Sequence, residues 1–421
     1  MSSHDLEGRV RAGSTALTRL LACDLDTFAS TYWAREALLS SRADRNDEDF
    51  GDLFSLAAVD ELLSRRGLRT PFLRLAKNGK TLPESAYTIG GGVGAGVRDQ
   101  ISDDAVLSLF ADGATVVLQG LHRTWEPVAR WSQDLAAALG HPVQVNAYVT
   151  PPQNQGFADH YDVHDVFVLQ VHGQKRWSIR EPVLPAPLRD QPWAERRREV
   201  EEAAAGPAAI EATLEPGDCL YLPRGYIHSA AALGGVSIHL TVGVHGWTRH
   251  HLAEALLDEA RSCLGRRREV RQSLALGADV ARPDAINEDL EVTREALIQA
   301  LREVPVDRVG ARMASRARDS QRPEALSPVS TGAAVASLDL SSALRQRAHL
   351  MLQTHPHGER GAMQVRSRAG RFTVPPEQVG ALHVFLDADW VTVADLDPDP
   401  ETALVAARSL VRHGVAVPVD A

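Results

Sequence analysis

The segment from Ala114 to Val244 constrains the fold of this chain most, because it consists of short β-rich runs bounded by glycine and proline. Such runs, rich in β-branched and aromatic residues and separated by turn residues, are typical of strands. We expect no helices between them, and therefore an antiparallel barrel or sandwich rather than a parallel sheet. The runs are TVVLQGL, VQVNAYVTPP, VFVLQVHGQKRWSIR, GDCLYLP and GVSIHLTVGV.

The length of 421 residues exceeds the size at which a single hydrophobic core stops growing, so we expect several domains. Residues 14–110 predict a helical lead-in to the strands, which together form a first domain at 1–247. Residues 248–342 predict a helical domain that ends in a Ser-, Arg- and Pro-rich linker at 314–342. Residues 343–421 predict a winged-helix-like unit, with helices in PPEQVGALHVFL and DPETALVAARSLVRHG and a strand in WVTVADL.

Charge and cysteine content restrict the class of protein. The formal net charge of -10 and the pI of about 5.9 argue against nucleic-acid binding through overall basicity. The three cysteines are Cys23, Cys219 and Cys263, a number and spacing that fit a reducing cytoplasm and no disulfide or zinc pattern. Neither a signal peptide at 1–11 nor a membrane-spanning apolar run is expected. We therefore expect a cytoplasmic protein that does not associate with membranes.

Two apolar stripes in the helical segment predict self-association. They recur at helical spacing between residues 250 and 305 and need a partner surface that one barrel does not supply. We therefore expect a homodimer. The stripes comprise Leu252, Leu256, Ala260 and Leu264, followed by Leu290, Leu297 and Leu301.

A candidate metal site lies in GFADHYDVHD and EPGDCLYLPRGYIHSA. In an extended stretch, His160 and Asp162 are two residues apart and project to the same side. His228 follows a strand whose glycine and proline residues define the turn geometry. Two histidines and one carboxylate on a β scaffold form the facial triad of non-haem Fe(II) sites, which leaves coordination positions open. His164 is a competing ligand that we rank below these three, because the chain is entering the next strand there.

An oxygenase that uses 2-oxoglutarate also needs a cation for the distal carboxylate. Lys175 meets this need, because alternation places it on the same face as Trp177 and Ile179, where an unpaired lysine is costly. The alternative is that Lys175 is exposed like Arg176. Three further residues are candidates for hydrogen bonds to the cosubstrate, although a structural role in the sheet is equally open for each. These are Asn146, Tyr148 and Ser237.

The same motifs give the sequence a family resemblance. NAYVTPPQNQGFADHYDVHDVFVLQVHGQKRW followed by PGDCLYLPRGYIHSA resembles the bacterial JmjC-domain, cupin-like ribosomal oxygenases. The resemblance extends to YWAREALL and DGATVVLQGLHR before the strands, and to a helical dimerisation segment and a winged-helix-like unit after them. It implies an α+β fold built on a double-stranded β-helix, the cupin/JmjC jelly roll, with N-terminal helices.

The resemblance also implies roles for individual residues. It places iron on His160, Asp162 and His228, the distal carboxylate of 2-oxoglutarate on Lys175, and Asn146 and Tyr148 in the cosubstrate pocket. Ser237 is placed less directly. Together with Fe(II), 2-oxoglutarate and O₂, such a chain would hydroxylate a protein side chain, an arginine or histidine of a ribosomal protein.

Three other functions remain open. A demethylase or a peptide hydroxylase would use the same centre. A non-catalytic cupin-fold binding module is also open. It would not need the metal ligands or the buried cation, so the presence of all four residues argues against it; these are His160, Asp162, His228 and Lys175. A cupin isomerase or dioxygenase with a three- or four-histidine site is disfavoured by Asp162 and Lys175.

Overall fold

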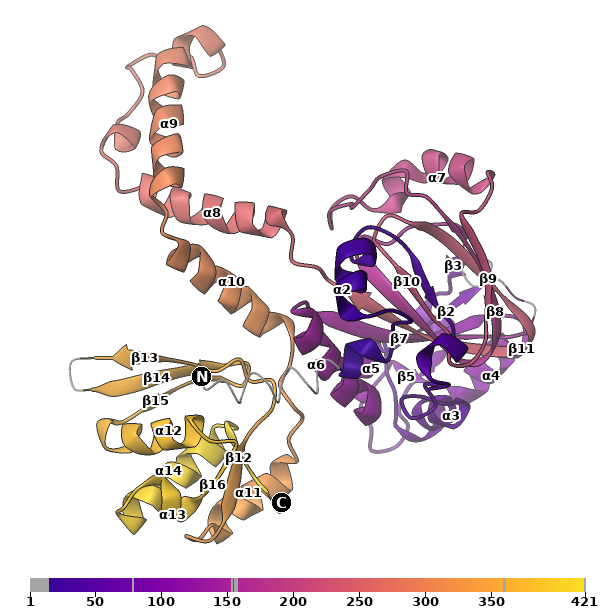
Figure 1. Ribbon diagram of the computed structural model, residues 1–421. Helices are drawn as coiled ribbons and strands as arrows, with labels where there is room; N and C mark the ends of the chain where they lie inside the picture. Colours follow the sequence, from indigo (N-terminus) through magenta and orange to yellow (C-terminus); the bar gives the residue numbers. More distant parts are fainter. Residues whose placement is uncertain (1–14, 78, 153, 155–157, 359–360, 420–421) are drawn as a thin grey trace. The chain divides into compact units, whose positions relative to one another are not determined.

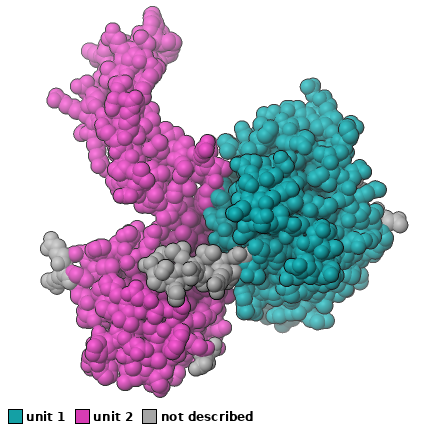
Figure 2. Space-filling model, viewed as in Figure 1, with its two compact units in different colours: residues 1–246 teal, residues 247–421 magenta. Residues whose placement is uncertain are grey.

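The computed structural model describes residues 15–77, 79–152, 154, 158–358 and 361–419, and Figure 1 shows the course of the chain. The expectation of no signal peptide at residues 1–11 falls outside these ranges. The chain divides into two compact units, Met1–Gly246 and Trp247–Ala421, which are coloured separately in Figure 2. Within the described ranges, no helix combines the length and the apolar character needed to cross a bilayer.

The first unit is built on one nine-stranded antiparallel sheet. Its two longest strands, β8 (Asp165–Arg180) and β11 (Ile227–Val244), pair along most of their length. β8 changes partner on its other side, from β10 in its first half to β9 in its second half. The first half of β8 therefore lies between β10 and β11, and its second half lies between β9 and β11. The strand order is β1 (Leu38–Ser40), β10 (Cys219–Leu222), β8, β11, β7 (Val143–Thr150), β6 (Thr115–Leu118), β2 (Leu73–Lys77) and β3 (Lys80–Thr81), with β9 (Ile210–Leu214) paired to β8.

Alternation along the strands separates a core face from a cavity face. On β7 the buried residues Val145 and Ala147 alternate with the half-buried Asn146 and Tyr148. The buried residues join the main apolar core of the unit together with α3 (Leu56–Arg65) and α6 (Glu126–Leu139). The other face of the strand is left for polar groups, and the candidate site lies there.

Three expectations for this unit are wrong. The lead-in at residues 14–110 is not purely helical, because β1, β2 and β3 join the main sheet through buried residues such as Leu73 and Leu75. Helices also intervene between the β-rich runs: α5 (Leu121–Thr124) and α6 separate β6 from β7, and α7 (Arg197–Ala204) precedes β9. Those helices lie between the runs on which the interpretation was based.

In the sequence, His172 next to Gly173 is typical of a hairpin turn, and this third expectation is also wrong. His172 and Gly173 lie inside β8, at a register shift against β11. Gly173 has a φ of +62°, and a Cβ there would lie 2.1 Å from the carbonyl oxygen of Val236. The glycine marks a β-bulge, which turn-forming residues in a strand can signal as well as a hairpin.

The second unit begins with helices and ends with a small mixed α/β core. α8 (Arg249–Leu264) packs on α9 (Pro283–Glu303), and α10 (Val306–Ser320) returns along α8 through Arg312, which pairs with Asp258 and Glu259. The remaining elements are α11 (Pro328–Ser337), β12 (Ala343–Gln346), β13 (Gln353–His357), β14 (Ala362–Ser367), β15 (Gly370–Val374), α12 (Val379–Leu386), β16 (Trp390–Thr392), α13 (Val393–Leu396), α14 (Pro400–Arg412) and β17 (Ala416–Pro418).

Two expectations for the second unit are also wrong. Residues 314–342 are not an unstructured linker: they contain the end of α10 and all of α11, and Val335 and Leu338 are buried in the core of the unit. The run WVTVADL is a strand only as far as Thr392, whose side chain then caps α13 together with Asp395. A threonine followed three residues later by an acid is a capping box, and this local signal outweighs the strand-like composition.

Candidate metal centre

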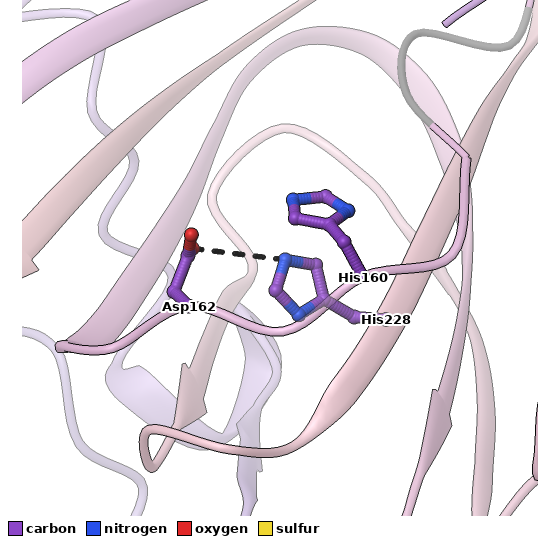
Figure 3. Close-up of side chains that lie close together, drawn as sticks. All are labelled: His160, Asp162 and His228. Carbon is purple, nitrogen blue, oxygen red and sulfur yellow. Dashed lines mark ion pairs between the residues drawn. The ribbon is translucent and has the colours of Figure 1, made fainter. Parts of the chain in front are cut away.

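Three side chains that could bind one metal ion converge at the end of the main sheet. One ligand atom each from His160, Asp162 and His228 lies within 4.8 Å of the others, and Figure 3 shows the two imidazoles and the carboxylate grouped together. His160 and Asp162 lie in the segment just before β8, and His228 is the second residue of β11. The backbones of His160 and His228 exchange hydrogen bonds of 3.2 and 2.8 Å. The main chain therefore brings together residues that are far apart in sequence.

Hydrogen bonds to backbone carbonyls orient both imidazoles. Nδ1 of His160 lies 2.8 Å from the carbonyl oxygen of Ala158, and Nδ1 of His228 lies 3.0 Å from that of Tyr226. A carbonyl oxygen only accepts, so each Nδ1 donates and the ring lone pair lies on Nε2. This tautomer, held by a backbone carbonyl, is the one that histidine ligands of metals commonly adopt. The donor set, two Nε2 atoms and one carboxylate, fits a facial Fe(II) triad.

Electrostatics keep the site ready to bind a cation at neutral pH. Burial alone would raise the pKa of Asp162, but the neighbouring histidines and Arg74 outweigh it and hold this pKa below its usual value. Burial lowers the pKa of His228 to about 4, and His160 acts in the same direction. The 3.8 Å contact between His228 Nε2 and Asp162 Oδ2 therefore joins a neutral imidazole to a carboxylate at neutral pH.

Two glycine turns hold the strand that leads into His228. Gly217 and Gly225 have φ values of +98° and +94°. A Cβ at Gly217 would lie 2.7 Å from the side chain of Arg42, and one at Gly225 would lie 2.5 Å from the carbonyl oxygen of Leu184. Only glycine combines this backbone conformation with such close contacts. These are the Gly positions of the motif on which the placement of His228 was predicted.

A cavity of about 260 Å³ adjoins the three ligands, and Lys175 lines it. The side chain of Lys175 is 3% exposed, and its ammonium group donates to Thr150 Oγ1 at 3.2 Å. Burial lowers the pKa of Lys175 to about 7. Arg176, one residue further along β8, is exposed. The structure thus places a buried cation in the cavity and the neighbouring cation outside it.

The other candidate residues lie at different distances from this cavity. Tyr148 lines it, and Asn146 lines an adjoining cavity that also includes Tyr148 and Asp162. The Asn146 side chain accepts a hydrogen bond of 3.0 Å from the backbone N–H of Gly120. Ser237 is fully buried, and its hydroxyl accepts from Gln170 at 2.9 Å. Ser237 is therefore held within the sheet and does not line the main cavity.

The competing ligand His164 lies outside the group of three. Its ring packs edge-on against His245, with ring centroids 5.0 Å apart. It still lies close enough to Asp162 to lower the pKa of that carboxyl group.

Sequence reasoning missed several residues that line the cavity. Extending the same-face alternation by two residues would have led from Ser237 to His239 on β11, which lines the cavity. The same step on β7 leads from Tyr148 to Thr150, which contacts the Lys175 ammonium. Arg74 comes from β2, in the segment that was interpreted as helical, so alternation was not applied there. Trp193 begins a short 3-10 helix (Trp193–Arg196) before α7, which is too short to show a periodic pattern, and its ring centroid is 6.3 Å from that of His160.

Comparison with known families matches this region to a named domain. The sequence profile described as the JmjC domain matches residues 121–252, which contain all three candidate ligands and Lys175. The matched segment extends from α5 to the start of α8, so it includes β7, β8, β10 and β11 of the main sheet.

Curated relatives share this part of the chain. Ribosomal oxygenase 1 of Homo sapiens is 32% identical over 228 residues, which cover 52% of this chain and 32% of that protein. A protein of Culex quinquefasciatus named bifunctional lysine-specific demethylase and histidyl-hydroxylase NO66 is 28% identical over 299 residues, 68% of this chain and 42% of that one. The chain thus spans between about a third and two fifths of the length of these relatives.

Solved structures resemble the chain over nearly its whole length. The Escherichia coli ribosomal oxygenase YcfD superposes with a TM-score of 0.54 at 17% identity, covering 94% of this chain and 98% of that one. A structure of YcfD in complex with cobalt and 2-oxoglutarate gives a TM-score of 0.50 at 18% identity, covering 95% and 99%. At this identity the likeness shows the fold: a JmjC/cupin-type fold of mixed helices and antiparallel sheets.

Proposed function

We propose that this protein is an Fe(II)- and 2-oxoglutarate-dependent oxygenase that hydroxylates a protein side chain. The observation that carries the proposal is the combination of a two-histidine, one-carboxylate cluster with a buried lysine in the same cavity. Among the described residues, the Lys175 ammonium contacts the Thr150 hydroxyl and lies over the Trp177 ring, but it pairs with no carboxylate. A buried ammonium in such surroundings is costly unless an anionic ligand compensates it. A pure binding module has no need of this combination.

Each group in the site has a part in this reaction. His160, Asp162 and His228 would hold the iron through two Nε2 atoms and a carboxylate oxygen, leaving the other coordination positions for cosubstrate and oxygen. Lys175 would pair with the distal carboxylate of 2-oxoglutarate and so fix its orientation. Tyr148 and Asn146 would contact the bound cosubstrate. Ser237 would support the site from within the sheet, where it accepts a hydrogen bond from Gln170. When bound, the iron supplies the oxidising chemistry that an unactivated C–H bond requires.

The proposed substrate is an arginine or histidine of a ribosomal protein. Support comes from the names of the relatives, ribosomal oxygenase 1 and histidyl-hydroxylase NO66, and from the likeness to YcfD. The NO66 relative is also named a lysine-specific demethylase, which makes removal of an N-methyl group the second candidate. Both reactions would use the same metal centre.

Mass spectrometry of the products separates these reactions. The protein is incubated with Fe(II), 2-oxoglutarate and ribosomal proteins of its host, and succinate and peptide masses are followed. Hydroxylation gives succinate and a peptide that gains one oxygen, whereas demethylation gives succinate, formaldehyde and a peptide that loses a methyl group. A protein that forms no succinate with any ribosomal or peptide substrate would contradict the proposed activity and favour a binding module.

Asp162→Ala is the matched control for this experiment. It removes the only carboxylate of the proposed triad, which groups outside the ligand set do not replace, so we expect no metal-dependent formation of succinate. Its circular dichroism should match that of the wild type, because a large strand core and not the metal holds the fold. Full activity of this variant would contradict the assignment of the ligands.

The proposed biological setting follows from the rest of the chain. Two copies of the chain would form a homodimer through α8 and α9. Residues 343–421 would act as a winged-helix-like domain that binds a protein partner. The acidic balance of the chain favours a protein over a nucleic acid as this partner. A cytoplasmic location agrees with the proposed ribosomal substrate and with the three free cysteines.

A further inference from the structure

His239 is a buried imidazole in the cavity to which the proposed function gives no part. It lies on β11, opposite Tyr148 of β7, and its side chain is 3% exposed while still lining the cavity. Two aromatic rings fix its orientation. The Tyr148 ring stacks on it at 5.0 Å with an interplanar angle of 3°, and the Trp177 ring meets it edge-on at 5.4 Å and 83°. The imidazole plane therefore cannot turn away from the cavity without breaking both contacts.

The polarity of this ring is not compensated within the described part of the protein. Nδ1 of His239 is buried and has no hydrogen-bond partner among the described residues. An unsatisfied buried polar group is destabilising, and a phenylalanine would give the same aromatic packing without that cost. The position of the imidazole in the cavity wall is explained if a bound ligand uses its hydrogen-bonding capacity.

The charge of the neighbourhood indicates what kind of ligand this is. Burial holds the pKa of His239 well below its usual value, and the positive charge of Lys175 acts in the same direction. His239 is therefore a neutral group with one N–H donor, next to a cation. Lys175 itself contacts Thr150 Oγ1, and no carboxylate of the described residues forms an ion pair with it. A carboxylate ligand has two oxygens that accept several hydrogen bonds, and a lysine ammonium satisfies only part of this capacity.

We infer that His239 is a second binding residue for the distal carboxylate of the cosubstrate, donating a neutral imidazole N–H beside the ammonium of Lys175. The inference rests on the proposed function, because it assigns a partner to the same dicarboxylate. The His239 donor would add selectivity for one dicarboxylate over another. The lysine supplies charge, which any nearby anion satisfies, whereas an imidazole clamped between two rings supplies a donor in one fixed direction and so selects for the length and geometry of the dicarboxylate.

Binding measurements with two inert ligands test this inference. Isothermal titration calorimetry is performed on the protein loaded with Mn(II), which resists oxidation by air. The ligands are N-oxalylglycine, which has a distal carboxylate, and oxalate, which chelates the metal but lacks one. His239→Phe keeps a flat ring for stacking and removes the N–H. We expect it to weaken N-oxalylglycine about tenfold, the effect of losing one hydrogen bond to a charged acceptor, and to leave oxalate binding unchanged.

Two further variants complete the test. His239→Gln keeps an N–H donor and should recover part of the lost affinity. His172→Phe makes the same replacement at an exposed position of β8 and should bind both ligands as the wild type does. Unchanged N-oxalylglycine binding by His239→Phe, an equal loss for oxalate, or no recovery with glutamine would each overturn the inference. A wild-type protein that binds neither ligand would instead contradict the proposed function.

Discussion

Burial and charge conflict at Lys175, and this conflict gives the sharpest test of cosubstrate binding. If the ammonium pairs with the distal carboxylate, Lys175→Ala leaves that carboxylate buried without its cation, at a cost of about 3 kcal/mol. We therefore expect a roughly hundredfold weaker affinity for 2-oxoglutarate, measured by calorimetry with Mn(II), while the metal affinity is retained. Arg176→Ala removes the adjacent, exposed cation and should change neither value. Equal effects at the two positions would show that Lys175 is not the anion-binding group.

The same burial predicts how cosubstrate affinity depends on pH. The pKa of Lys175 without cosubstrate is about 7, and the dicarboxylate binds the protonated form. As pH rises above this value the ammonium loses its proton, so the apparent affinity for 2-oxoglutarate should fall, approaching about tenfold per pH unit well above the pKa. Lys175→Arg places a group that stays protonated at the same position. Its affinity should be lower but nearly constant between pH 7 and pH 9, and an equally steep fall in this variant would assign the titration to another group.

The residues at the centre of the site could be predicted from the sequence, whereas most of the residues that form the cavity wall could not. His160, Asp162, His228 and Lys175 occur in motifs whose spacing and turn glycines limit where the side chains can point, and the structure brings all four to one cavity. The wall depends on which strands pair and in which register. Local sequence does not determine that pairing. The wall residues from β2 and from the 3-10 helix Trp193–Arg196 could therefore not be derived, although strand alternation already contained the signal for His239.

At the scale of elements, the bulge in β8 is a position where adding one methyl group should strongly lower the stability of the fold. A Cβ at Gly173 would overlap the carbonyl oxygen of Val236, in addition to the cost of a positive φ. We expect Gly173→Ala to lower the free energy of unfolding by about 3 kcal/mol, as calorimetry would measure. Gly234 has a φ of +70° with open space around its Cβ position, so Gly234→Ala should cost about 1 kcal/mol. Similar losses at the two glycines would show that β11 moves aside to accommodate the extra atom.

Elements with a strong periodic pattern were predicted, and elements that depend on tertiary packing were not. The β8 run, the second half of β11 and the α14 run correspond to segments predicted from composition and spacing, although the bulge in β8 and the first half of β11 were not predicted. α11 is different, because its sequence PVSTGAAVAS contains serine, threonine and glycine, which have little intrinsic helix propensity. Burial of Val335 and Leu338 against the core of the second unit supplies the stabilisation that the local sequence lacks.

At the scale of the whole molecule, α9 presents an apolar surface that the described residues of the chain do not cover. Of its 21 residues only Ala296 and Ala300 are buried, while Leu290 is 44% exposed and Leu257 on α8 is 51% exposed. Stable homodimers usually bury such surfaces. We expect the wild type to have a dimeric mass by light scattering at micromolar concentration. The double variant Leu257→Glu, Leu290→Glu should be monomeric, because association would bury its carboxylates.

A matched variant distinguishes loss of the interface from a general effect of surface charge. Leu107 on α4 (Asp103–Ala111) is 68% exposed and lies in the first unit. Leu107→Glu should therefore leave the dimer intact. A wild-type protein that is monomeric at these concentrations would overturn the homodimer prediction.

The reciprocal backbone hydrogen bonds between His160 and His228 have a consequence for the evolution of this protein. Main-chain atoms hold the two segments together, so their spacing does not depend on the imidazoles or on a bound ion. A single codon change at either position would remove a metal ligand and leave the folded surfaces in place. If the proposed activity and homodimer hold, a gene duplicate would become a catalytically silent copy in one step and would still associate with the active chain.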